Sequence, residues 1–115
     1  RAAHALAVMK QRAGDLDTAQ TLLTMAIDHD PSFAPVYVQL GALHLVNGKM
    51  EDARKLFKIL VNLNEDDRPA PEQLVQVLPL PDGTILLVNA YLEEGNRQAA
   101  RRAVQEIEKK IWRKF

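Results

Sequence analysis

The 115-residue sequence contains no cysteine, which excludes disulfide bonds and thiolate metal sites. Aromatic residues make up only 5% of the chain, too few for the stacking platforms that bind nucleic-acid bases. Fifteen basic residues balance fifteen acidic residues, so the chain lacks the surplus positive charge that binds nucleic acids and anionic membranes. No apolar run approaches the roughly 20 residues that span a bilayer. These absences predict no nucleic-acid partner and no membrane span.

Motifs for catalysis are also missing, because the sequence has no G-x-S-x-G, phosphate-binding loop or H-E-x-x-H pattern. His4, His29 and His44 lack the close spacing of metal ligands. Four acidic residues fall at predicted helix starts, where they complement the helix dipole: Asp15, Asp17, Glu51 and Asp52. We therefore expect no enzyme activity, no catalytic residues, no cofactor and no metal site.

What the sequence does contain is an internal repeat. Residues 14–23 read GDLDTAQTLL and residues 48–57 read GKMEDARKLF. Gly48 follows Gly14 by 34 residues, and this separation is the repeat period. Leu40 likewise follows Leu6 by 34 residues. A third copy follows the second after one period plus 13 inserted residues; it is recognised by Gly95, Ala100, Val104 and Ile107.

Apolar residues at helical spacing predict four helices in the first two copies, over 2–13, 17–29, 35–47 and 51–63. In the first of these, the apolar positions are Ala3, Leu6, Ala7 and, less regularly, Met9. Gly14 and Gly48 are expected to end the first and third helices in the left-handed conformation. Asp30 precedes Pro31 and is expected to end the second. The short turns predict antiparallel helix pairs.

The inserted segment lies within 64–83 and contains four prolines, which predicts a connector with one short helical turn at 72–78. Its apolar residues are too many for a disordered linker: Leu74, Val75, Val77, Leu78 and Leu80. We expect 72–80 to pack against the repeats near the junction of the second and third copies. There it would restrict one end of the groove on the inner face of the stacked repeats. Alternatively, it would lie on the outer edge of the stack without touching this groove.

A helix–turn–helix repeat with a period of about 34 residues resembles the tetratricopeptide repeat. The second copy carries the resemblance through Tyr37, Leu40, Gly41, Gly48, Ala53 and Phe57, and the other copies through equivalent positions. The chain departs from the family pattern at Val88 and Leu60, where small residues are expected, and at Glu65, where a proline is expected.

The resemblance implies an all-α fold of antiparallel helix hairpins, stacked as a short right-handed solenoid. One domain would cover 1–115, with its parts at about 1–33 (repeat 1), 34–64 (repeat 2), 65–82 (proline-rich insertion) and 83–115 (repeat 3 with a C-terminal capping helix). In the capping helix, which starts at Arg97, the apolar stripe is formed by Ala100, Val104, Ile107 and Ile111. A basic amphipathic helix of this kind can also bind a membrane surface or a partner, but a solvated outer face is favoured.

The resemblance also implies that a partner binds the inner face, which is formed largely by the first helix of each repeat. In the second copy this helix is apolar on both sides, and such a helix is expected to be covered all round. We predict a groove for a protein or peptide, such as an amphipathic segment, lined by His4, Val8, Val38, Ala42, Leu45, Val46, Ile85, Asn89 and Leu92. Family members that clamp an acidic carboxyl terminus use lysines and asparagines on these helices, so that partner class is not expected.

Two alternatives stay open. The insertion or the terminal helix would cover the apolar face from within the same chain. Otherwise the repeats would serve self-association, as a homo-oligomer or as an assembly domain of a larger multi-repeat protein.

Overall fold

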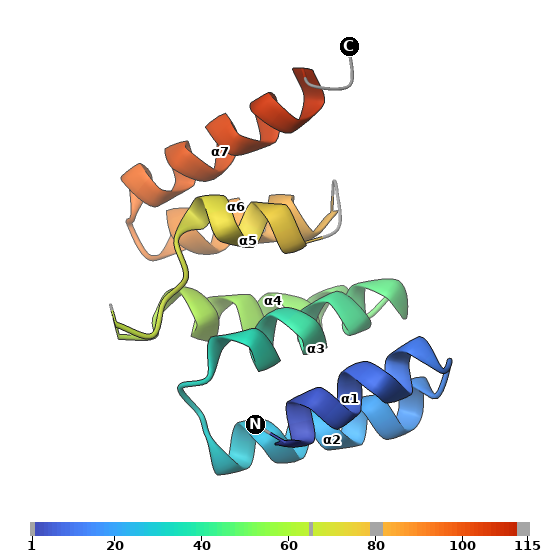
Figure 1. Cartoon of the computed structure of the whole chain (residues 1–115). Coiled ribbons are helices and arrows are strands. Elements are labelled where there is room, and N and C mark those ends of the chain that lie inside the picture. The colour runs from blue at the N-terminus through green and yellow to red at the C-terminus, as the bar shows by residue number, and fades with distance from the viewer. Residues whose placement is uncertain (1, 65, 79–81, 113–115) are drawn as a thin grey trace.

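The computed structural model describes residues 2–64, 66–78 and 82–112, and this part of the chain forms seven α-helices and no strand (Figure 1). The helices are α1 (Ala2–Arg12), α2 (Leu16–His29), α3 (Ala34–Val46), α4 (Met50–Val61), α5 (Pro71–Val77), α6 (Asp82–Glu93) and α7 (Arg97–Trp112). The four helices predicted in the first two copies are confirmed to within two residues at either end. None of these seven helices combines the length and the apolar character needed to cross a membrane.

Three glycines close the tight turns, and they share one backbone conformation. Gly14, Gly48 and Gly95 have φ of 84°, 74° and 77°, a region that side chains with a Cβ rarely adopt. The residue after each glycine donates its backbone N–H to a carbonyl in the last turn of the helix: Asp15 to Lys10 (2.9 Å), Lys49 to His44 (2.8 Å) and Asn96 to Tyr91 (2.9 Å). The predicted helix ends at Gly14 and Gly48 are therefore confirmed.

The core consists of two groups of buried side chains, and small residues in it let neighbouring helices approach. Ala19 and Ala53 are fully buried and Ala100 is 4% exposed. One group of buried side chains joins α1, α2 and α3 and is made of Ala7, Ala19, Leu23, Ala26, Val36, Leu40 and Leu43. A second group continues from α3 and α4 through α5 to α6 and α7.

The predicted helix α1 is present, but most of its apolar side chains are not buried. Only Ala7 of its apolar positions is buried, whereas Leu6 is 43% exposed and Met9 is 65% exposed. The equivalent residue of the second copy, Leu40, is buried because it packs against the preceding hairpin with Ala7 and Leu23. No described helix lies before α1, so nothing in that part of the chain covers Leu6.

The predicted apolar stripe of α7 is buried only in part: Ala100 is buried and Ile107 packs against the core. Val104 is 39% exposed and Ile111 is 46% exposed, and the helix instead buries Ala99, Ala100, Ala103 and Glu106. The reason is that α7 packs against α5 as well as against α6. The small side chains of the alanines allow this second helix to come close.

Helix α5 belongs to the proline-rich segment, and it is an integral part of the core. Leu74, Val75 and Leu78 are 2%, 0% and 3% exposed and pack among side chains of α6 and α7. The packing expected for this segment is therefore present as far as Leu78, and Leu80 lies outside the described residues.

Candidate functional site

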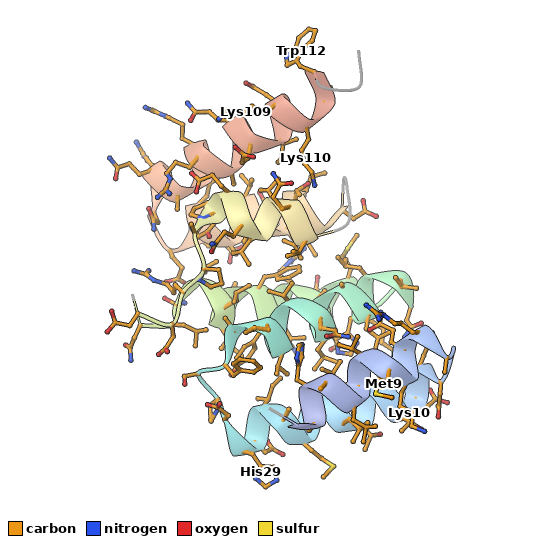
Figure 2. The ribbon with its side chains drawn as sticks, in the orientation of Figure 1. Met9, Lys10, His29, Lys109, Lys110 and Trp112 are labelled. Carbon is orange, nitrogen blue, oxygen red and sulfur yellow. The ribbon has the colours of Figure 1, made fainter. Side chains whose placement is uncertain are left out.

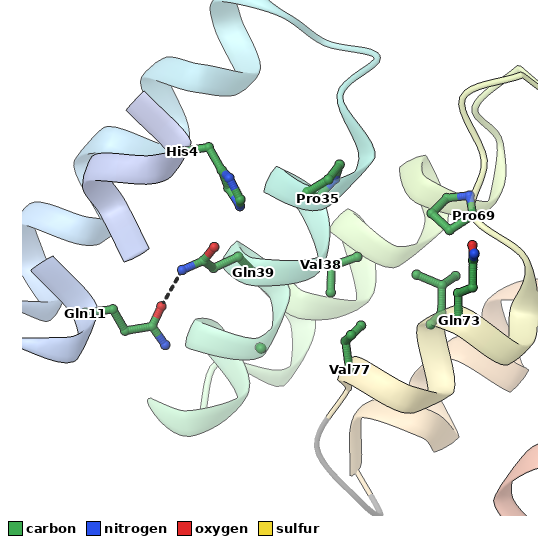
Figure 3. Close-up of a pocket in the computed structure, with 10 residues that line it drawn as sticks. His4, Gln11, Pro35, Val38, Gln39, Pro69, Gln73 and Val77 are labelled. Atoms are coloured by element: carbon green, nitrogen blue, oxygen red, sulfur yellow. Dashed lines mark hydrogen bonds between the residues drawn. The ribbon is translucent and has the colours of Figure 1, made fainter. Parts of the chain in front are cut away.

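A cleft of about 490 Å³ lies between α1, α3 and α5 (Figure 3). This volume falls within the range of about 300–1,000 Å³ that is usual for ligand sites in proteins. Its lining residues come from all three helices and from the segment before α5: His4, Gln11, Pro35, Val38, Gln39, Ala42, Pro69, Gln73, Leu74 and Val77.

The lining is apolar with a few polar groups, and the described residues that form it carry no carboxylate, ammonium or guanidinium group. Proline rings and aliphatic side chains supply most of the surface, from Pro35 and Val38 on one side to Pro69 and Val77 on the other (Figure 3). The polar groups are glutamine amides and one imidazole. A neutral lining of this kind favours a ligand without charges, because a charge placed here would lose hydration without gaining a partner.

Two of the glutamines are fixed by each other. Gln39 Nε2 on α3 donates a hydrogen bond of 2.8 Å to Gln11 Oε1 on α1 (Figure 3). An amide side chain has both an acceptor and two donors, so the bonded pair still offers the oxygen of Gln39 and the amide hydrogens of Gln11. A peptide backbone has an N–H donor and a C=O acceptor in each residue other than proline, so it can pair with this combination of acceptor and donors.

His4 stands at the α1 side of the cleft and is held by an aromatic contact. Its ring meets Phe33 edge to face, with the ring centroids 5.5 Å apart and an angle of 88° between the planes. Among the described residues there is no cluster of three or more histidine, cysteine, aspartate or glutamate side chains that could hold a metal ion.

The nine predicted groove residues lie in several places. The structure brings His4, Val38 and Ala42 together at the cleft. Val8 lines an adjoining hollow with Arg12, and this hollow shares Gln11 and Gln39 with the cleft. Leu45 is half-buried and packs against the core. Exposed positions outside the cleft hold Val46 (71% exposed), Ile85 (53%), Leu92 (51%) and Asn89.

The residues of the 69–77 segment at the cleft were missing from the predicted groove: Pro69, Gln73, Leu74 and Val77. The repeat period carries a signal that would have found them. Leu74 follows Leu40 by one period, just as Leu40 follows Leu6, so the period itself places α5 next to α3.

Polar contacts with α7 hold α5 in place. Arg102 pairs with Glu72 through two hydrogen bonds, Nε to Oε1 at 2.6 Å and an Nη2 bond to Oε2 at 2.8 Å. Lys110 Nζ, on the side of α7 that faces α5 (Figure 2), donates to the carbonyl oxygen of Val75 at 2.9 Å. These hydrogen bonds from Arg102 lower the pKa of the Glu72 carboxyl and raise the pKa of the guanidinium.

A third contact lies deeper in the same interface. Gln76 Nε2 donates to Glu106 Oε2 at 2.8 Å, and Glu106 is only 8% exposed. Lys109 lies 3.4 Å from the other carboxylate oxygen of Glu106. The buried carboxylate thus has a partner at each oxygen, as a buried charge requires.

Stacked helical hairpins with glycine-closed turns and a cleft on one side define a helical-repeat protein. A model of the tetratricopeptide repeat family matches residues 11–78, which is more than half of the chain. The chain therefore belongs to the tetratricopeptide repeat family. No match was found among curated proteins. Repeats of this family are in general scaffolds for protein–protein interaction and are typically non-catalytic.

Proposed function

We propose that the chain binds a segment of another protein in the cleft between α1, α3 and α5. The observation that carries this proposal is the lining, which combines an apolar surface with the amides of Gln11, Gln39 and Gln73 and, among the described residues, contains no carboxylate, ammonium or guanidinium group. The partner segment is uncharged and mostly apolar where it enters the cleft. Its backbone N–H and C=O groups pair with the glutamines.

Binding peptides obtained by display selection against the intact chain would test the proposal. Val38→Glu places an unpaired charge in the cleft, and we expect affinity for a selected peptide to fall about tenfold or more. Ile59→Glu is the matched control, because Ile59 is an apolar residue of α4 that is 46% exposed and lies outside the cleft. Equal losses with the two variants, or no loss with either, would contradict the proposal.

The dependence of the affinity on salt distinguishes this proposal from binding at a charged site. Because the described lining residues of the cleft are uncharged, we expect the affinity to change little between low and high ionic strength. A binding constant that falls steeply with salt would point to another surface of the molecule.

Self-association is the second candidate, and exposed apolar side chains at the two ends of the stack favour it. Met9 (65% exposed) and Met25 (47%) lie on α1 and α2, whereas Ile111 (46%) and Trp112 (73%) lie on α7. Figure 2 shows Met9 and Trp112 at opposite ends of the molecule. Sedimentation velocity over a range of concentrations tests this alternative, and association that is lost in Met9→Glu and Ile111→Glu, but not in Ile59→Glu, would support it.

A further inference from the structure

Helix α5 lies in the sequence where the repeat period expects the first helix of a third repeat. Leu40, Gly41 and His44 of α3 correspond, one period later, to Leu74, Val75 and Leu78. All three of the later residues are at most 3% exposed, as the inward positions of a first helix should be. The match to the family model also extends through α5, since it ends at residue 78.

The same period assigns α6 to the place of a second helix. Ala53 and Phe57 of α4 correspond to Leu87 and Tyr91 of α6, which are 0% and 4% exposed. Helix directions agree with this register. In Figure 1, α1, α3 and α5 run one way across the molecule and α2, α4 and α6 run the other way. The turn between α6 and α7 lies at the edge where α2 leads to α3, opposite the turns that join α1 to α2 and α3 to α4.

We propose that α5 is the third helix of the partner-binding face, in series with α1 and α3, and that Arg102 of α7 positions it there. This inference rests on the proposed function and specifies its surface. The binding face then includes Gln73 and Val77 of α5, while Ile85 and Leu92 of α6 lie outside it. The third copy recognised at Gly95, with its longer offset from Gly48, describes the turn between α6 and α7, where Gly95 has a positive φ like Gly14 and Gly48.

The anchoring on α7 follows from the side chains between α5 and α6. Val75 stands where α3 has Gly41, and Leu87 stands where α4 has Ala53. These larger residues keep α5 and α6 from the close approach that α3 and α4 make, and α5 packs most closely on α7 instead. The wall of the cleft is therefore held by its buried apolar side chains and, through α7, by the Glu72–Arg102 pair and the contacts beside it.

Two matched variants test whether α5 or α6 completes the partner-binding face. Val77 and Ile85 are both exposed apolar residues, at 64% and 53%, and only Val77 lines the cleft. With a display-selected peptide as the probe, we expect Val77→Glu to weaken binding about tenfold and Ile85→Glu to leave it unchanged. The opposite result, or the same result for both variants, would overturn the proposal.

Hydrogen exchange tests the positioning role of Arg102 without any peptide. The pair is partly exposed, with side-chain exposures of 52% for Arg102 and 36% for Glu72. A partly exposed pair contributes up to about 1 kcal/mol, so Arg102→Met should speed exchange of the α5 amides by about two- to fivefold. Arg102→Lys keeps the positive charge but lacks the planar guanidinium that forms two parallel hydrogen bonds. Its rate of α5 amide exchange should lie between the rates of the native chain and of Arg102→Met. Exchange in α1–α4 should stay as in the native chain, and Arg101→Met is the control on α7.

The two measurements separate the two proposals. If no selected peptide binds the cleft, the proposed function fails, and the α5 binding face fails with it. The exchange data then still show whether Arg102 holds α5. Unchanged α5 exchange in Arg102→Met, or equal acceleration throughout the chain, would overturn the positioning role even if peptides bind.

Discussion

The ring of Phe57 on α4 lies directly against the backbone of Gly41 on α3. A Cβ added at Gly41 would lie 2.9 Å from Cε1 and 3.0 Å from Cζ of that ring. Real Cβ atoms essentially never come so close to another heavy atom. The absence of a side chain at Gly41 is thus what allows the central hairpin to close on a large aromatic residue, which is itself fully buried.

Gly41→Ala should therefore destabilise the protein, although alanine is the better helix former. The gain in helix propensity is about 1 kcal/mol, while overpacking in a core costs about 1–3 kcal/mol. We expect a net loss of about 1 kcal/mol in the free energy of unfolding, measured by chemical denaturation. In the background of Phe57→Leu the same alanine should be neutral or stabilising. Additive effects of the two substitutions would show that the ring does not limit the approach of the helices.

The central hairpin was predictable because its helices are regular and its neighbours cover both sides. Tyr37, Leu40 and Gly41 are buried as the helical spacing required. At the ends of the stack the same spacing was a poor guide, because burial there depends on which helix lies alongside. Leu6 has the same repeat position as Leu40 and is exposed, and Val104 is exposed because α5 packs against the alanine face of α7.

The cleft could be predicted only in part for a related reason. His4, Val38 and Ala42 follow from the repeat, since first helices form the inner face of this family. The prolines of the 69–77 segment predicted a connector with a short helical turn at 72–78, and α5 forms at this place. Pro71 is its first residue, a position where the missing N–H of proline costs nothing. Sequence spacing also does not reveal long-range polar contacts such as Glu72 with Arg102, which lie 30 residues apart.

Ala53→Leu tests the close contact between helices at the start of α4. Ala53 is fully buried, so the added side chain has no space without movement of a helix. We expect a loss of about 1–3 kcal/mol in the free energy of unfolding, seen as a lower melting temperature. Lys55→Leu introduces the same residue at an exposed position of α4 and is the control. If Ala53→Leu melted at the same temperature as the control, the closest contact between the helices would not lie at Ala53.

Acid should loosen α5 before it unfolds the stack. The pKa of Glu72 is lowered from its ordinary value of 4.5, chiefly by its hydrogen bonds with Arg102. A carboxyl with a lowered pKa stabilises the folded state above its ordinary pKa, and this contribution is lost as the pH falls through the lowered value. Amide exchange in α5, corrected for the intrinsic effect of pH, should therefore rise below about pH 4.5 relative to α3 and α4. In Glu72→Gln this additional rise should be absent, and its persistence would assign the acid sensitivity to another group.

His44 gives the protein a second pH dependence, nearer to neutrality. Its side chain is 8% exposed, and Nδ1 is a buried atom without a hydrogen-bond partner in the described part of the chain. Burial lowers the pKa of His44 below its ordinary value of 6.5; the carboxylate of Asp52 opposes this shift and the ammonium of Lys49 adds to it. The unfolded chain therefore takes up a proton near pH 6.5 that the folded chain does not, and stability falls as the pH drops below that value.

Denaturation at pH 7.5 and at pH 5.5 measures the effect. One proton contributes a slope of at most about 1.4 kcal/mol per pH unit, so a loss of up to that size is expected over this interval. His44→Leu removes both the titrating group and the unpaired nitrogen, and we expect it to be at least as stable at pH 7.5 and to flatten the pH dependence. His29→Leu, at an exposed position near the end of α2, is the control. If His44→Leu kept the full pH dependence, the buried imidazole would not be its source.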